Sequence, residues 1–120
     1  MTDRDVVNIL GAGLCGSLLA VMLARRGFPV TLRELRADPR SSSQSAGRSI
    51  NLALSARGIR GLKHAGVFDK VRHLLLPMRG RMIHGPTGSL AFQAYGKDPS
   101  QAIHSVSRGG LNLTLVEAAE

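Results

Sequence analysis

The sequence is poor in cysteine and in aromatic residues. Its 120 residues include one cysteine, one tyrosine, three phenylalanines and no tryptophan. The single cysteine, Cys15, excludes a disulfide framework and a zinc site built from thiolates. The four histidines are too far apart for a short metal-ligand motif, so we predict no metal site. The core must therefore be built from leucine, valine, isoleucine and alanine.

Long apolar runs are also lacking. The longest uncharged apolar run, residues 14–24, is too short to cross a bilayer. The first residues, MTDRDVV, do not have the apolar centre of a signal peptide. We therefore expect a cytoplasmic protein of one domain at most.

Acidic residues are scarce, since the sequence has 8 of them and 16 lysines and arginines. The resulting net charge of +8 would suit a polyanionic partner. The basic residues are scattered from Arg4 to Arg108, and no aromatic residues are interleaved with them to stack bases. A basic nucleic-acid-binding module stays as an alternative, and it predicts DNA binding with a steep salt dependence. A dinucleotide cofactor is a polyanion too, so charge alone does not separate the two.

Glycine, in contrast, is abundant and falls into a pattern at residues 8–28, NILGAGLCGSLLAVMLARRGF. The β-forming residues at 6–10 predict a buried strand, and residues 14–24 predict a helix that is apolar all round and therefore buried. Gly27 and Pro29 end that helix, and a second strand follows up to Glu34. This order of strand, glycine loop, helix and strand is that of a Rossmann βαβ unit.

The spacing of Gly11, Gly13 and Gly16 indicates how the loop would bind a dinucleotide. Gly11 allows the tight turn, Gly13 leaves room for a pyrophosphate, and Gly16 lets the helix pack closely on the strand. Glu34 can accept hydrogen bonds from ribose hydroxyls, which favours NAD or FAD over NADP. Cys15 lies in the first helical turn, but without a partner base we interpret it as a small packed residue.

The rest of the α/β chain continues with a polar loop at residues 37–49. Ser55 can cap a helix that runs toward Gly66, and a second helical segment over residues 67–76 is ended by Pro77. Residues 81–96 predict a β-hairpin. A last helix follows with one apolar face, formed by Leu111, Leu115 and Val116. This helix has no capping residue at its end, so we expect a piece of a longer protein.

Residues 47–67, GRSINLALSARGIRGLKHAGV, resemble the second segment of the FAD-dependent aromatic hydroxylases, most closely that of the kynurenine 3-monooxygenase family. The similarity continues through PMRGRMIH at 77–84, AYG at 94–96 and SVSRGGLN at 105–112. Together with GAGLCGS at 11–17, these blocks follow the order and spacing of the family. The resemblance implies a Rossmann-like FAD-binding unit with a following helical segment and β-hairpin, a truncated part of a larger flavin hydroxylase fold.

The resemblance also implies a flavoprotein monooxygenase that hydroxylates L-kynurenine with NADPH and O₂, a reaction of tryptophan degradation and pyridine nucleotide biosynthesis. Because the flavin performs the oxygen chemistry, it implies no catalytic side chain. The residues that it implies for FAD binding are Gly11, Gly13, Leu14, Gly16, Arg33, Glu34, Arg36, Ala53 and Arg108. Arg48 is a weaker candidate. By position alone, Arg108 is rather a solvated arginine at a helix start.

Arg81 and Tyr95 match the family's substrate-binding residues, although spacing alone would make them ordinary hairpin positions. An arginine offers two parallel donors to the carboxylate of kynurenine, and a tyrosine adds a hydroxyl and an aromatic wall. The resemblance thus divides the chain into a glycine loop (8–34), a second flavin-side segment (47–76), a substrate-side hairpin (77–96) and an Arg108 segment (105–120).

Two later motifs of the family, an Asp-Gly block and a Gly-Asp block, are absent from these residues. We therefore expect that the 120 residues cannot turn over alone, and that exposed apolar surface makes them self-associate or pair with a missing C-terminal part. Another FAD-dependent aromatic-ring hydroxylase and an NAD(P)-dependent Rossmann oxidoreductase remain as alternative enzymes.

Overall fold

The N-terminal part of the chain folds as a strand, a helix and a second strand. The computed structural model describes residues 5–41 and 50–120. Strands β1 (Val7–Leu10) and β2 (Val30–Arg33) pair in parallel, and α1 (Leu14–Ala24) connects them. Gly27 turns the chain after α1 with a φ of 78°, which glycine adopts without strain. This is the βαβ unit that the glycine pattern predicts.

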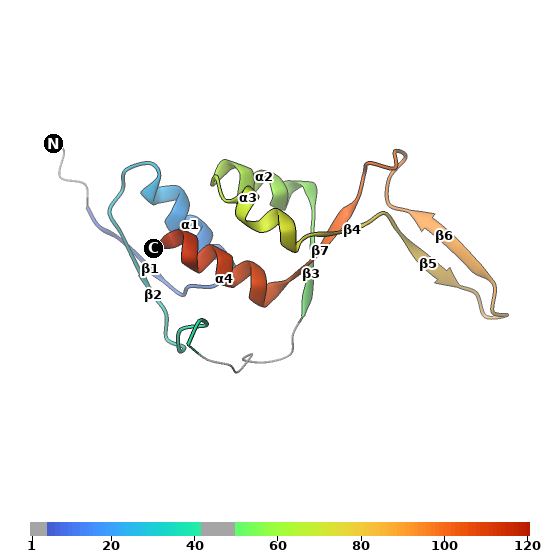
Figure 1. Cartoon of the computed structure of the whole chain (residues 1–120), viewed down its shortest axis with the longest axis horizontal. Helices are drawn as coiled ribbons and strands as arrows, with labels where there is room; N and C mark the ends of the chain where they lie inside the picture. The colour runs from blue at the N-terminus through green and yellow to red at the C-terminus, as the bar shows by residue number, and fades with distance from the viewer. Residues whose placement is uncertain (1–4, 42–49) are drawn as a thin grey trace.

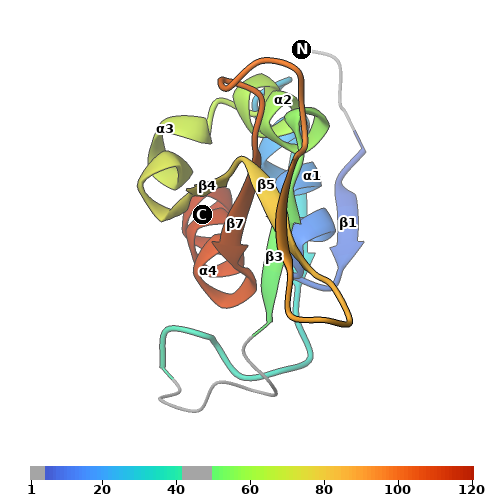
Figure 2. The same cartoon turned by 90° about the vertical axis from the view of Figure 1, so that its right-hand side faces the viewer.

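A second, antiparallel sheet has the strand order β3–β7–β4. Its strands are β3 (Asn51–Leu54), β7 (Ile103–Ser107) and β4 (Leu76–Met78), and β7 lies in the middle. Helix α2 (Ala56–His64) follows β3, and β7 leads directly into α4 (Arg108–Ala119), which Figure 2 shows along the long axis. Strand β7, near the end of the chain, therefore pairs with two strands from the middle of the sequence.

The core lies where the helices meet the second sheet. Its buried residues come from all four helices, the turn after α2 and strand β7, namely Val21, Leu62, Ala65, Val67, Val71, Val106, Leu111 and Leu115. Helix α1 packs along α4 (Figure 1). The end of α1 is also tied to the end of α2, since Arg25 Nη1 donates to the carbonyl oxygen of Ala65 at 2.6 Å.

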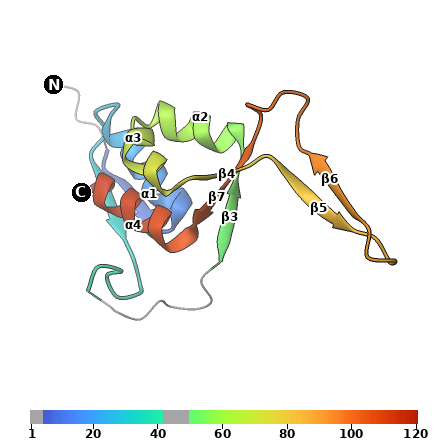
Figure 3. The same cartoon turned by 45° about the vertical axis from the view of Figure 1, so that its right-hand side comes forward.

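The predicted hairpin is present and extends away from this core (Figures 1 and 3). Strands β5 (Gly80–His84) and β6 (Leu90–Ala94) pair in antiparallel register, with Arg81 opposite Gln93. Every residue of β6 is exposed. The molecule is consequently elongated, with principal extents of 67 × 34 × 21 Å.

The helix predicted over residues 67–76 is wrong in length. Helix α3 covers only Phe68–Val71, and a short 3-10 helix covers Arg72–Leu74. Pro77 does not follow a helix but lies inside strand β4. A proline is tolerated there because β4 is an edge strand. The outer side of an edge strand pairs with no neighbouring strand, so it needs no N–H donor.

Three finer expectations also need correction. Strand β1 is not buried as a whole, because Ile9 is buried whereas Leu10 is exposed. Helix α1 is only partly buried, because Ser17, Ala20 and Val21 are buried whereas Leu19 is exposed. Ser55 does precede α2, but its side chain makes no capping hydrogen bond. Within the part of the chain that the structure describes, no helix is both long and apolar enough to cross a membrane.

Candidate dinucleotide-binding site

The loop between β1 and α1 ends with a helix start that no side chain caps. Gly11 has a φ of 102°, and its N–H donates to the carbonyl oxygen of Arg33 at 2.7 Å, which ties the loop to the end of β2. Gly13 occupies the N-cap position in extended conformation, and it has no side chain to satisfy the first amides of α1. Uncapped amides and the positive end of the helix dipole favour an anion at this point.

Gly13 and Gly16 have opposite surroundings. A Cβ atom added at Gly13 would meet no atom within 4 Å, so open space lies in front of the helix start. A Cβ atom added at Gly16 would collide with the carbonyl oxygen of Gly11 and come within 3.3 Å of Ile9. Gly16 is therefore needed for the close packing of α1 against the loop, whereas Gly13 leaves space for a ligand.

Glu34 follows β2 and joins this loop. Its Oε2 accepts a hydrogen bond from the Ala12 N–H at 2.8 Å, and its Oε1 accepts from the N–H and the Nε of Arg36 at 2.9 and 3.1 Å. The hydrogen bonds from Arg36, followed by that from Ala12, lower the pKa of Glu34 from 4.5 to about 2. The carboxylate is therefore ionised at neutral pH and faces the glycine loop.

A groove of about 700 Å³ opens at this place, and we call it the glycine-loop groove. Arg108, the first residue of α4, comes to it from near the end of the chain because its N–H donates to the Ile50 carbonyl oxygen at 3.2 Å and Ser107 caps α4. The groove is lined by Ile9, Leu10, Gly11, Gly13, Leu14, Cys15, Gly16, Leu19, Glu34, Arg36 and Arg108. It thus brings the start of α1 together with two arginines and one glutamate.

The groove contains seven of the nine residues predicted to bind the cofactor, namely Gly11, Gly13, Leu14, Gly16, Glu34, Arg36 and Arg108. Two others lie elsewhere: Arg33 contributes its carbonyl oxygen to the loop, and Ala53 is exposed on β3 opposite Ser105. Arg48 lies outside the described residues. Cys15 lines the groove rather than filling the loop, and it is exposed.

Three further groove residues, Ile9, Leu10 and Leu19, were not predicted from the sequence. Leu10 is the last residue of β1, and Leu19 lies one turn beyond Cys15 on α1. Both leucines are exposed, and such exposure at the end of a strand and on an apolar helix is a signal for a ligand wall.

The two predicted substrate residues lie on the hairpin. Arg81 Nε donates to Gln93 Oε1 at 2.7 Å across the two strands, and the Tyr95 N–H continues the pairing by donating to the Arg79 carbonyl oxygen at 2.9 Å. Arg81 lies on β5 opposite Gln93, whereas Tyr95 lies in a bend that directly follows β6. Both are exposed to solvent.

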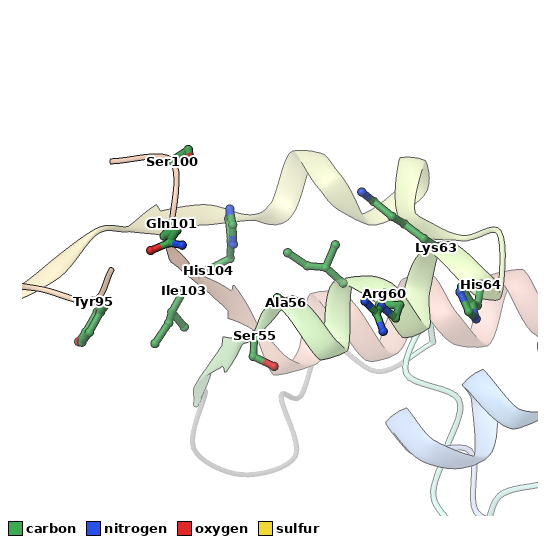
Figure 4. Close-up of a pocket in the computed structure, with 12 residues that line it drawn as sticks. Ser55, Ala56, Arg60, Lys63, His64, Tyr95, Ser100, Gln101, Ile103 and His104 are labelled. Atoms are coloured by element: carbon green, nitrogen blue, oxygen red, sulfur yellow. The ribbon is translucent and has the colours of Figure 1, made fainter. Parts of the chain in front are cut away.

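Tyr95 also lines a second cavity, of about 830 Å³, between α2 and residues 95–104. Figure 4 shows Tyr95 toward one end of it and Lys63 and His64 toward the other. Arg81 is not among the lining residues, so the structure does not bring Arg81 and Tyr95 into one cavity.

Comparison with known proteins assigns the fold and the relatives. The model of the NAD(P)-binding Rossmann-like domain family matches residues 9–75, which includes the glycine loop and Glu34. The chain belongs to this family. The predicted fold class, an α/β Rossmann-like unit, is thus confirmed.

The chain is also homologous to kynurenine 3-monooxygenases, as the quoted motifs predict. It is 52% identical over 117 residues to "Kynurenine 3-monooxygenase" of Myxococcus xanthus, with 98% of this chain and 25% of the relative covered. For the Cytophaga hutchinsonii protein of the same name the identity is 51% over 119 residues, with 98% and 26% covered. The chain therefore spans about a quarter of the length of these curated relatives.

Solved structures of oxygenases share the fold. The tetrameric form of 2-methyl-3-hydroxypyridine-5-carboxylic acid oxygenase superposes with a TM-score of 0.74 at 20% identity, covering 98% of this chain and 29% of that one. A putative FAD-containing monooxygenase from Photorhabdus luminescens gives a TM-score of 0.67 at 23% identity, covering 92% and 27%. The Rossmann-like unit thus matches one part of larger monooxygenase structures.

Proposed function

We propose that this chain is the FAD-binding part of a monooxygenase that hydroxylates L-kynurenine with NADPH and O₂. The observation that carries the proposal is the meeting of three distant segments in the glycine-loop groove: the glycine loop, Glu34 with Arg36, and Arg108. The sequence identity of about 50% to kynurenine 3-monooxygenases over nearly the whole chain supports FAD as the cofactor and L-kynurenine as the substrate.

The groove fits the adenosine diphosphate half of FAD. The open space beside Gly13 and the uncapped start of α1 suit the pyrophosphate, and the guanidinium of Arg108 can neutralise its charge. The ionised Glu34 carboxylate suits a ribose with free hydroxyls, since Oε2 accepts one protein hydrogen bond and keeps capacity for another.

In this proposal the protein binds and orients, and bound FAD would supply the activation of O₂, with NADPH as the reductant. On the substrate side, Arg81 and Tyr95 hold the amino acid part of kynurenine, because guanidinium and hydroxyl groups donate to a carboxylate. Arg81 lies on β5 and Tyr95 directly follows β6, and both are solvent-exposed within these 120 residues.

Flavin retention is the direct test. The purified chain is mixed with FAD and desalted, and we expect flavin absorbance to stay with the protein. Glu34→Ala and Gly13→Val should both lose it, the first by removing the ribose acceptor and the second by filling the open space at the helix start. A thermal melt of each variant separates loss of binding from loss of fold. Equal retention in all three proteins would contradict the proposal.

One alternative has an observation in its favour, because the matching family model is one of NAD(P)-binding domains. The same desalting experiment with NAD⁺ in place of FAD distinguishes the two. Retained flavin without retained NAD⁺ supports the monooxygenase, and the reverse result supports an NAD-dependent oxidoreductase.

We further propose that the chain alone does not turn over, because it spans a quarter of the relatives and leaves the hairpin uncovered. The assay is NADPH oxidation that depends on added kynurenine. Turnover by the purified 120 residues would overturn this part and would leave FAD binding to be judged on the retention experiment.

A further inference from the structure

Glu34 is held by the protein on both sides before any ligand is considered. The N–H and the Nε of Arg36 both donate to Oε1, while the Ala12 N–H donates to Oε2. The carboxylate therefore bridges the end of β2 and the glycine loop. The Glu34 side chain retains 21% of its accessible surface, so the bridge borders the groove rather than lying in the core.

We infer that Arg36 is a positioning residue, which acts on the cofactor through Glu34 and not through its own contact with phosphate. This inference rests on the proposed FAD binding. Arg36 donates to Oε1 from its backbone N–H and from Nε, and the Nε hydrogen bond restrains the carboxylate so that Oε2 keeps its place beside the Ala12 N–H, where the proposed ribose would bind.

The alternative role for Arg36 is that of a simple positive charge beside the phosphates. Its side chain is 67% exposed, and a solvent-exposed charge contributes little by attraction alone. The hydrogen bond from Nε, in contrast, depends on direction and is specific to a guanidinium placed two residues after Glu34. Lysine at this position would preserve the charge and lose the Nε donor, so the two roles make different predictions.

The first test is a double-mutant cycle on FAD affinity, measured by flavin fluorescence titration of the 120-residue chain. We expect Arg36→Ala to weaken FAD binding about two- to five-fold, since the loss of an exposed ion pair is small. Glu34→Ala should weaken it about tenfold or more. If Arg36 acts through Glu34, adding Arg36→Ala to Glu34→Ala causes no further loss. Additive losses would overturn the inference.

Arg36→Lys sharpens the same test. We expect it to bind FAD as weakly as Arg36→Ala, because the charge remains but the hydrogen bond from Nε is gone. Recovery of wild-type affinity by lysine would assign Arg36 the role of a charge and overturn the inference. Arg57→Ala, an exposed charge removal on α2, is the matched control and should bind FAD as the wild type does.

The second test needs no cofactor. Amide hydrogen exchange of Ala12, followed by NMR in the free chain, reports whether Glu34 holds the loop. We expect the exchange to accelerate several-fold in Arg36→Ala and to stay unchanged in Arg57→Ala. Unchanged exchange in Arg36→Ala overturns the inference. If the wild-type chain binds no FAD, the proposed function fails and the Ala12 amide alone decides whether Arg36 positions Glu34.

Discussion

The glycine-loop groove is assembled from three distant parts of the chain and rests on a packed core, whereas the β5–β6 hairpin is one continuous segment with solvent on both faces. Arg108 reaches the groove from the end of β7, which pairs between β3 and β4. The hairpin holds its shape through its own cross-strand bonds and leaves Met82, Leu90 and Phe92 exposed. The backbone of the groove is therefore held by a packed core, whereas the proposed substrate residues lie on a hairpin that the described part of the chain leaves uncovered.

The difference has a physical cause. A phosphate site at a helix start is made mostly of backbone amides, so a βαβ turn is enough to form it. A site for a small organic substrate buries most of its ligand, which requires walls on several sides. Two exposed strands, with Arg81 on β5 and Tyr95 directly after β6, supply at most a single wall.

The strongest way to break the comparison is to cut one leucine from each region. Leu115 on α4 is 2% exposed, and Leu90 on β6 is 63% exposed. We expect Leu115→Ala to lower the free energy of unfolding by about 2–5 kcal/mol, and Leu90→Ala to change it by less than about 0.5 kcal/mol. Urea unfolding of both variants measures this. Equal losses would mean that the hairpin is packed in solution, for example in a self-associated form.

Within the groove, two glycines sharpen the contrast between packing and binding. Gly16→Ala places a Cβ atom against the Gly11 carbonyl oxygen, and overpacking of this kind costs about 1–3 kcal/mol. Gly13→Ala meets no neighbour and should cost less than about 1 kcal/mol, the difference between these residues at a helix N-cap. Thermal unfolding should therefore separate the two variants, although we expect both to weaken flavin retention. Equal stability would contradict the close packing at Gly16.

The features of the fold that could be predicted from the sequence are those whose physical cause lies within a few neighbouring residues. The βαβ unit and the hairpin were predictable because apolar periodicity and turn glycines act over a few residues. The pairing of β3 with β7 and the place of Pro77 in an edge strand were not, because they depend on contacts far apart in the sequence. The partial exposure of α1 is also a property of the whole fold, since an apolar helix is buried only where neighbours cover it.

The candidate site shows the same division. The glycines and Glu34 follow from the local pattern, whereas the approach of Arg108 to the glycine loop came from the resemblance and could not be derived from its position at a helix start. The ties that Glu34 makes to Ala12 and Arg36 were not predicted at all, since they depend on side-chain geometry.

If the two regions act separately, a substitution in the hairpin should not affect flavin binding in the glycine-loop groove. We expect Arg81→Ala to leave FAD retention of this chain unchanged, because Arg81 contacts Gln93 and does not line the groove. At the matching position of a full-length kynurenine 3-monooxygenase, the same change should lower the affinity for kynurenine about tenfold or more, the loss of a hydrogen bond to a charged group. Arg57→Ala serves as the control for charge removal. Unchanged kynurenine affinity would remove Arg81 from the substrate site.

The smallest expected effect concerns pH. The pKa of Glu34 is about 2 in the folded chain against an ordinary value of 4.5, so its ionised form stabilises the fold. This contribution is fully present above pH 4.5 and is lost as the pH falls toward about 2. The difference in melting temperature between wild type and Glu34→Gln should therefore shrink over that range. Asp38, whose pKa Arg40 also lowers to about 2, is common to both proteins and cancels in this difference. With Glu117→Gln as the control for one lost charge, a difference that stays constant down to pH 2 would mean that Glu34 does not join the glycine loop to β2 in solution.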